Sequence, residues 1–398
     1  MGNVNGVRNC FGCGVCAISC GKKLIDIRLN KDGFYEPYIA EPQKCTDCGL
    51  CVEVCSYSHN DYALRKSSLT SYAAWSKEPA VRKKCSSGGV GFEVGRYLIS
   101  QGYLVLGCRY NTEVNRAEHY VASTIEELIP SIGSKYIQSY TVDGLKQIDR
   151  KKKYLVTGTP CQIDSFRRYI QKFRCEDNFI LMDFFCHGVP SMLMWKQYRK
   201  LVEKKLGKLT YVSWRDKTYG WHDSWAMIID GEKNINHSSH SGNELMSENK
   251  GLFCSRLSQG DIFYKLFLGD FCMNPACRNT CRFKYDKSSA DIRIGDLWGK
   301  TYKNNEDGVS AVVAFTNRGY SIIDKLNCQL ISHSFEEVAE GQMKKNAKSA
   351  VLSFVAMKML RSDKYFSEKD WRWLFFMESI FHIPFRLKCK IKNVLKSK

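Results

Sequence analysis

The sequence has no apolar run of the roughly 18 residues that a membrane-spanning helix needs. Its first residues, MGNVNGVRNC, lack the basic and apolar segments of a secretory signal peptide, so we expect a cytoplasmic protein. Helix-turn-helix, zinc-finger and RNA-recognition signatures are also missing, which argues against a nucleic-acid partner. The composition, 44% hydrophobic and 25% charged, is that of a folded protein and excludes a disordered or collagen-like chain.

Acidic residues are scarce relative to basic ones. The chain has 41 Asp and Glu against 60 Lys and Arg, a net charge of +19. The basic excess lies in residues 61–398, because residues 1–60 are balanced. A solvated surface explains such a balance, and so does an anionic cofactor, an acidic protein partner or an anionic membrane surface.

Cysteine is abundant instead, with 19 residues. Two clusters share the spacing C-x2-C-x2-C-x3-C, and each cysteine of the first returns 35 positions later in the second. The two clusters comprise Cys10, Cys13, Cys16 and Cys20, and Cys45, Cys48, Cys51 and Cys55. This is an internal repeat of two similar halves.

The spacing predicts two 4Fe–4S clusters. Three cysteines at three-residue steps surround one cubane, and the fourth ligates the cubane of the other half. We therefore expect Cys55 to complete the first cluster and Cys20 the second. A disulfide framework would need strained short loops and an oxidising compartment. Zinc usually takes two separated C-x2-C pairs. Residues 24–39, with Asp32-Gly33 at a turn, read as a hairpin between the clusters, as in two-cluster bacterial ferredoxins.

The rest of the chain predicts an α/β body. Strands are expected over 103–110, 154–157 and 179–185, each beside a helical segment. Loops 158–162 and 186–191 follow two of these strands, where ligands of such sheets bind. We expect a two-cluster module (1–60), a linker (61–80), two parts of one mixed α/β body (81–160 and 161–330) and a helical, basic C-terminus (331–398).

A third group of cysteines lies in the second part of the expected α/β body. Cys272, Cys277 and Cys281 match no standard zinc spacing and predict three ligands of a third 4Fe–4S cluster. Cys161 or Cys186, each on a loop after a predicted strand, would supply the fourth. Catalytic thiol chemistry is the competing role for those two cysteines, and a plain structural role is the third alternative.

Several segments of the sequence resemble those of a known family. The segments that carry the resemblance are CSSGGV (85–90), IGSKYIQS (132–139), GTPCQ (158–162), DFFCHGVPS (183–191), the 272–281 cysteines and DIRIGDLWG (291–299). In this order they are similar to the coenzyme F420 hydrogenase/dehydrogenase beta-subunit family, over roughly residues 1–330. The resemblance implies an iron–sulfur flavoprotein that passes electrons between clusters, FAD and a soluble acceptor such as coenzyme F420.

The resemblance also implies site residues. Ser87, Gly88 and Gly89 would hold a flavin phosphate, although a plain helix cap by Ser86 or Ser87 explains the same residues. Ser134, Lys135 and Tyr136 would contact the flavin, Lys135 by charge and Tyr136 by stacking. The remaining candidates are Thr157, Gly158 and Thr159 against the flavin or a cluster, Asp296 and Trp298 in a loop after a strand, and Cys186 and His187 as catalytic residues.

We therefore expect a flavin-dependent iron–sulfur oxidoreductase with a small-molecule substrate and a redox partner protein or soluble electron carrier. The alternative is a non-catalytic electron-transfer subunit that docks to an enzyme. The aromatic segment 371–377 and the basic segment 385–398 add an expectation of peripheral contact with an anionic membrane, against the alternative of a terminal helix packed on the body.

Overall fold

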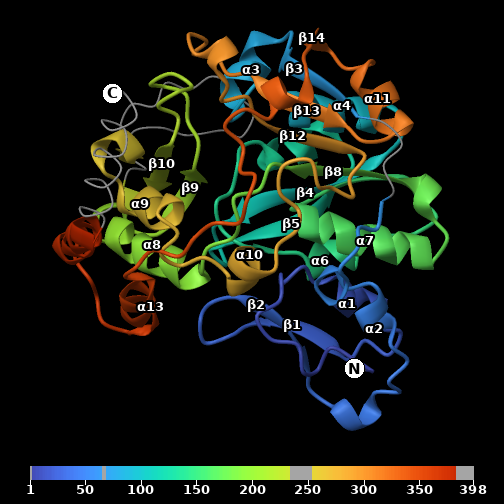
Figure 1. The fold of residues 1–398 in the computed structure, drawn as a ribbon, viewed down its shortest axis with the longest axis horizontal. Coiled ribbons are helices and arrows are strands. Elements are labelled where there is room, and N and C mark those ends of the chain that lie inside the picture. The colour runs from blue at the N-terminus through green and yellow to red at the C-terminus, as the bar shows by residue number, and fades with distance from the viewer. Residues whose placement is uncertain (1, 65–68, 234–252, 382–398) are drawn as a thin grey trace, which may run out of the picture.

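The computed structural model describes all residues except 1, 65–68, 234–252 and 382–398. Its N-terminal module contains two short helices, α1 (Val15–Ser19) and α2 (Leu50–Glu53), and a hairpin of β1 (Ile25–Leu29) and β2 (Tyr35–Ile39). The strands pair antiparallel, and Gly33 adopts the positive φ of 76° that the turn between them requires. The predicted hairpin is therefore confirmed. In Figure 1 this module lies at one end of the body, next to α6 (Val142–Leu145) and α7 (Pro160–Lys172).

Within the described residues, nine strands form one mixed sheet in the order β14-β3-β13-β12-β8-β7-β4-β5-β6. Neighbouring strands from β12 to β4 run parallel, and β13, β3 and β14 extend the sheet antiparallel. The strand bounds are β3 Thr70–Ser76, β4 Leu104–Asn111, β5 Arg116–Ala122, β6 Ser139–Tyr140, β7 Tyr154–Thr157, β8 Phe179–Phe184, β12 Ile292–Asp296, β13 Ser310–Ala314 and β14 Cys328–Ser332. The predicted mixed α/β fold is confirmed.

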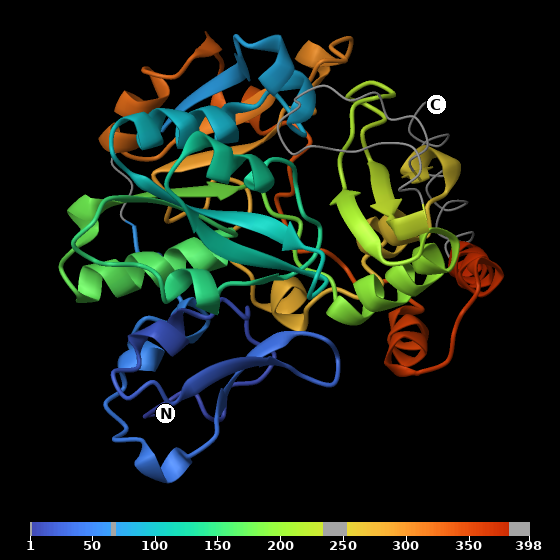
Figure 2. The same cartoon turned by 180° about the vertical axis from the view of Figure 1, so that it is seen from behind.

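Helices cover both faces of this sheet because its central strands are apolar on both sides. Leu155 and Ile180 pack towards α4 (Val90–Ser100) and α11 (Asn317–Ile323). Val156 and Leu181 pack in the opposite direction against α7, in a cluster that also contains Cys13 of the N-terminal module. Figure 2 shows the sheet from behind, with the module below it. The module therefore shares a hydrophobic core with the body.

The segment 61–80, predicted as a linker, is corrected by the structure. It contains β3, which pairs with both β13 and β14 inside the sheet. Ala73 and Ala74 of this strand are fully buried, so residues 70–76 belong to the core. The border at 160/161 likewise crosses one continuous sheet, because β7 pairs with β8. Long-range pairing of this kind leaves no mark in local composition.

A smaller sheet of β9 (Leu209–Ser213), β10 (Ala226–Gly231) and β11 (Phe253–Arg256) packs with α8 (Met192–Leu206) and α9 (Ile262–Leu268) beside the main sheet. The C-terminal part adds α13 (Ser353–Arg361) and a helix over 368–381. The remaining helices are α3 Pro79–Lys84, α5 Ile125–Leu128, α10 Pro275–Asn279 and α12 Phe335–Val338. No helix of the described residues has both the length and the apolarity to cross a membrane.

Candidate functional site

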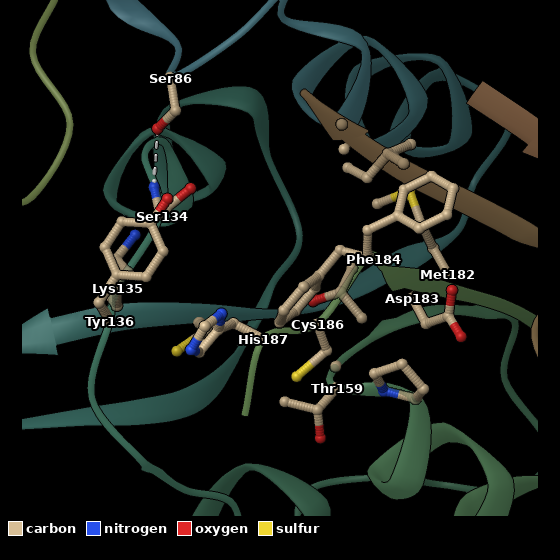
Figure 3. A pocket seen from close by; sticks show the side chains of 18 of the residues that line it. Ser86, Ser134, Lys135, Tyr136, Thr159, Met182, Asp183, Phe184, Cys186 and His187 are labelled. Carbon is tan, nitrogen blue, oxygen red and sulfur yellow. Dashed lines mark hydrogen bonds between the residues drawn. The ribbon is translucent and has the colours of Figure 1, made fainter. Parts of the chain in front are cut away.

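A cavity of about 510 Å³ lies where the parallel strands β7, β8 and β12 end. Its volume falls in the range of small-molecule and cofactor pockets. Figure 3 shows side chains that line it. The predicted site residues that line it are Ser87, Gly89, Ser134, Lys135, Tyr136, Thr157, Gly158, Thr159, Cys161, Cys186, His187, Cys277, Cys281, Asp296 and Trp298. The structure thus brings together residues that are up to 211 positions apart, from Ser87 to Trp298.

Gly88 is an exception among the predicted cofactor residues. It does not line the cavity, because its backbone packs between β3 and β13. A Cβ atom there would lie within 2.4 Å of the Ala74 carbonyl oxygen. We therefore assign Gly88 to close backbone packing and remove it from the phosphate-binding residues.

The loop before α4 meets the cavity without a side-chain cap. Gly89 occupies the N-cap position with φ of 88°. Ser87 donates its hydroxyl hydrogen bond to the Val309 carbonyl at 2.7 Å, and the Ser86 hydroxyl accepts one from the Ser134 N–H at 2.9 Å. Neither serine caps the helix, so that predicted alternative is wrong. The positive end of α4 remains directed at the cavity for an anionic group.

Lys135 does not extend its charge towards a ligand as predicted. Its ammonium donates hydrogen bonds to four carbonyl oxygens of its own loop, those of Pro130, Ser131, Ile132 and Gly133, at 2.9–3.2 Å. Burial lowers the pKa of Lys135 to about 8. The side chain therefore stabilises the cavity wall, with its donors committed to the protein.

Arg215, which the sequence analysis missed, organises the opposite wall. Its guanidinium binds both carboxylate oxygens of Asp296 at 3.0 and 3.2 Å and donates to the Tyr136 hydroxyl at 3.1 Å. Its guanidinium carbon also lies over the rings of Trp225 and Trp298, at 4.9 and 5.2 Å from their centroids. Asp296 is consequently an ion-pair partner, and the two rings and Tyr136 present a fixed aromatic surface.

Four cysteines from three segments meet at one side of the cavity. Cys161 begins α7, Cys186 follows β8, and Cys277 and Cys281 lie in and after α10. Burial raises the pKa of Cys161 well above its ordinary value, and nearby Cys277, Cys186 and Cys281 raise it further. This group supplies four thiol donors, the number that a 4Fe–4S cubane takes.

Cys272 does not join this group, so its prediction as a ligand is corrected. Its thiol lies in the hydrophobic core and contacts the Met194 sulfur at 3.3 Å. Burial raises the pKa of Cys272 to about 12, and nearby Asp270 raises it further. The chain turns between Cys272 and α10, which directs Cys272 towards α8 and Cys277 towards Gly188. Cys186 takes the place that the sequence spacing assigned to Cys272.

Two polar side chains border the four-cysteine group. Lys284 donates hydrogen bonds to the carbonyl oxygens of Cys186 and His187, at 2.7 and 2.8 Å, although only 6% of it is exposed. The His187 ring is bonded to Asp270 through Nε2 at 2.7 Å and lines the cavity. A carboxylate that is hydrogen-bonded to one ring nitrogen orients the imidazole, so that the other ring nitrogen is available for proton transfer.

In the N-terminal module, Cys10, Cys13, Cys16 and Cys55 surround a small cavity. Burial raises the pKa of Cys16, and nearby Cys13, Cys55 and Cys10 raise it further. Cys55, the last cysteine of the second sequence cluster, therefore lies with Cys10, Cys13 and Cys16 of the first. Cys45 and Cys48 are the neighbours of Cys51, and Cys20 is half-buried against the core that holds Cys51.

The thiol groups fit iron–sulfur clusters by their chemistry. Burial raises the pKa of Cys277 to about 12 and that of Cys13 to about 11, so both keep their protons when nothing is bound. A bound metal centre reverses this preference, since coordination deprotonates a thiol. All 18 cysteines of the described residues are free thiols. No three His, Cys, Asp or Glu side chains of the described residues converge on a single metal ion.

The group of Cys10, Cys13, Cys16 and Cys55 contacts the body next to the four-cysteine group in the cavity wall. The Ser165 hydroxyl of α7 lies 3.3 Å from the Cys13 sulfur and accepts a hydrogen bond from the Ser56 N–H at 2.9 Å. Ser56 in turn donates its hydroxyl to the Cys161 carbonyl at 3.0 Å. Phe11 packs with Phe283 beside Cys161 and Cys281. The two cysteine groups are thus connected through the side chains of Phe11, Ser56 and Ser165.

Comparisons with known proteins identify a family for most of the chain. Family models match residues 71–146 as the N-terminal part and residues 151–335 as the C-terminal part of "Coenzyme F420 hydrogenase/dehydrogenase, beta subunit", and residues 9–58 as a 4Fe–4S dicluster domain. A search of curated proteins found no match. Among solved structures, a chain of the F420-reducing [NiFe] hydrogenase complex from Methanosarcina barkeri is similar, with 20% identity over 76% of this chain and 90% of that chain and a TM-score of 0.44. By the family models, this chain belongs to the coenzyme F420 hydrogenase/dehydrogenase beta-subunit family and is an iron–sulfur electron-transfer protein with a 4Fe–4S dicluster domain.

Proposed function

We propose that the protein is an iron–sulfur flavoprotein oxidoreductase that binds FAD in the 510 Å³ cavity and a third 4Fe–4S cluster at Cys161, Cys186, Cys277 and Cys281. The observation that carries the proposal is the four-cysteine group in the wall of a cofactor-sized cavity. FAD would supply the step between one-electron clusters and two-electron organic chemistry. The acceptor or donor would be a small organic molecule such as coenzyme F420, and we expect the protein in the cytoplasm.

Each part of the cavity supports one role. The uncapped N-terminus of α4 at Gly89 suits a phosphate, and the aromatic surface of Tyr136, Trp225 and Trp298 suits a flat ring. His187, oriented by Asp270, would hold or transfer a proton at its Nδ1 atom when an organic substrate is reduced. The packed contact at Phe11, Ser56 and Ser165 supports an electron route from the cluster of Cys10, Cys13, Cys16 and Cys55.

The test is cofactor analysis of the full chain after anaerobic purification. Three cubanes would bring about twelve irons per chain, and acid extraction should release about one FAD. A brown protein that retains its iron, releases no flavin and binds no added FAD would favour the alternative of a non-catalytic electron-transfer subunit. About eight irons would indicate that only the N-terminal module holds clusters.

The C-terminal helix over 368–381 has exposed aromatic side chains that point to a further binding partner. Its Trp371 and Leu374 are buried, whereas Trp373, Phe376 and Phe381 are 61%, 62% and 52% exposed. One face of the helix therefore packs on the body, as the predicted alternative requires. A second, apolar face stays exposed, beside the exposed side chains of Lys369 and Arg372. We propose that this face contacts an anionic membrane surface. The basic segment 385–398 lies outside the described residues.

For this contact we expect the full chain to sediment with vesicles of anionic lipid and much less with neutral ones. Changing Trp373→Ser together with Phe376→Ser should reduce that binding several-fold, because both rings are exposed and their loss leaves the fold intact. The exposed Phe354→Ser on α13 is a matched control for loss of a surface ring elsewhere. Equal sedimentation of the double variant and the unchanged protein would contradict the membrane contact.

A further inference from the structure

Ser165 of α7 brings a fully buried hydroxyl from the body to a cysteine of the N-terminal module. Its oxygen lies 3.3 Å from the Cys13 sulfur, although 152 positions separate the two residues. The same oxygen accepts a hydrogen bond from the Ser56 N–H at 2.9 Å. The hydroxyl proton is therefore left for the sulfur, because the Ser165 hydroxyl has no other hydrogen-bond partner in the described residues.

The direction of this hydrogen bond depends on the protonation of Cys13. As a free thiol, Cys13 donates its own proton to the Ser165 oxygen. A cysteine that binds iron is a thiolate without a proton, so the serine hydroxyl then becomes the donor. A hydrogen bond to a charged acceptor is roughly twice as strong as one between neutral groups. The position of Ser165 therefore suits a Cys13 that ligates a cluster.

The internal repeat provides a reference for this contact. In both halves, the backbone N–H two positions after the first cysteine donates to the sulfur of that cysteine, from Gly12 to Cys10 at 3.3 Å and from Asp47 to Cys45 at 3.4 Å. The second cysteines of the two halves differ, since Cys13 is buried against Ser165 whereas Cys48 is exposed. The serine contact is therefore supplied by the body and does not belong to the turn that both halves share.

Burial makes a cluster at Cys10, Cys13, Cys16 and Cys55 difficult to reduce. All four cysteines are buried, and an added electron brings a negative charge into a place that water cannot solvate. A hydroxyl that donates to a ligand sulfur stabilises the reduced form more than the oxidised form, because the reduced form is more negative. Hydrogen bonds to the sulfurs are among the factors that set the reduction potential of such clusters.

We infer that the Ser165 hydroxyl donates a hydrogen bond to the Cys13 sulfur when the first 4Fe–4S cluster is bound, and that it raises the reduction potential of this cluster. Ser165 is a positioning residue, since it acts on the cluster through Cys13. One helical turn before it on α7, Cys161 belongs to the four-cysteine group. The inference depends on a cluster held by Cys13 and holds whether or not the cavity binds FAD.

The experiment is a redox titration of the full chain, purified anaerobically and followed by EPR of the reduced clusters. Changing Ser165→Ala should lower the equilibrium constant for one-electron reduction of one cluster about tenfold, which is a shift of about 59 mV to lower potential. The potentials of the other clusters should stay close to those of the unchanged protein, because the Ser165 hydroxyl contacts only the Cys13 sulfur among the ligands.

Ser19→Ala is the matched control. The Ser19 side chain is also buried beside the first cluster, but its hydroxyl donates to the Cys16 carbonyl oxygen at 2.9 Å and not to a sulfur. This variant should therefore leave every potential unchanged. A shift in Ser19→Ala as large as that in Ser165→Ala would overturn the inference, because loss of any buried hydroxyl would then explain the effect.

A second pair of variants keeps the test decisive if Ser165→Ala does not retain its iron. Ser165→Thr keeps the hydroxyl and Ser165→Val has nearly the same shape without it, so the potential should be lower in Ser165→Val. Equal potentials in this pair, or in Ser165→Ala and the unchanged protein, overturn the inference and leave the flavin proposal untouched. An unchanged protein without clusters in its N-terminal module would remove the acceptor of the hydrogen bond and, with it, the inference.

Discussion

Replacing Cys277 with alanine should remove about four of about twelve irons from the anaerobically purified protein, whereas Cys272→Ala should remove none. The two residues are five positions apart and both are buried, yet Cys277 lies beside Cys161, Cys186 and Cys281, whereas Cys272 contacts Met194. Iron analysis with EPR of the reduced protein measures the difference. The signals of the N-terminal clusters should persist in both variants.

Iron analysis of further single-cysteine variants tests which cysteine supplies the fourth ligand of the third cluster. The spacing predicted that either Cys161 or Cys186 would complete a set of three that included Cys272. Because the structure places both beside Cys277 and Cys281, Cys161→Ala and Cys186→Ala should each lose the same iron as Cys277→Ala. Full iron in either variant, or loss of iron in Cys272→Ala, would contradict the four-cysteine group.

Changing Arg293→Met should lower the free energy of unfolding by about 3–5 kcal/mol, because it leaves the Asp183 carboxylate buried without its counter-charge. The guanidinium binds both oxygens of Asp183 at 2.7 Å, and both side chains are fully buried. It also donates to the carbonyl oxygens of Tyr285 and Lys287, so it ties the end of β8 to the segment after Cys281. We therefore expect weaker retention of the third cluster's iron as well.

Chemical unfolding under anaerobic conditions measures this effect, with two controls. Lys208→Met removes the exposed pair with Glu113 and should change stability by less than about 1 kcal/mol. The double change Asp183→Leu with Arg293→Met removes both charges and should recover much of the loss, since no buried charge is left unpaired. A double variant no more stable than Arg293→Met would show that the Arg293 contacts to Tyr285 and Lys287 matter more than the charge on Asp183.

Local patterns predicted much of the site. The glycine- and serine-containing loop at 85–90 and the loops at 158–162 and 186–191 follow or precede segments of clear periodicity, and all meet at the strand ends that α/β folds use for ligands. Arg215, His119 and Lys284 carried no comparable signal. Each is an isolated residue in an ordinary segment, and its contacts include residues that are distant in the sequence, such as Thr157 for His119 and Asp296 for Arg215.

The cysteine repeat, the hairpin at 24–39 and the strands at 103–110, 154–157 and 179–185 could be predicted from the sequence alone, because they depend on neighbours a few residues apart. The place of β3 in the central sheet, the binding of Lys135 by its own loop and the presence of Cys186 instead of Cys272 in the four-cysteine group emerged from the tertiary structure. A side chain's direction at a turn, and its partner across the fold, follow from how distant segments pack. Periodicity within one segment therefore cannot reveal which buried cysteine faces the cavity and which faces the core.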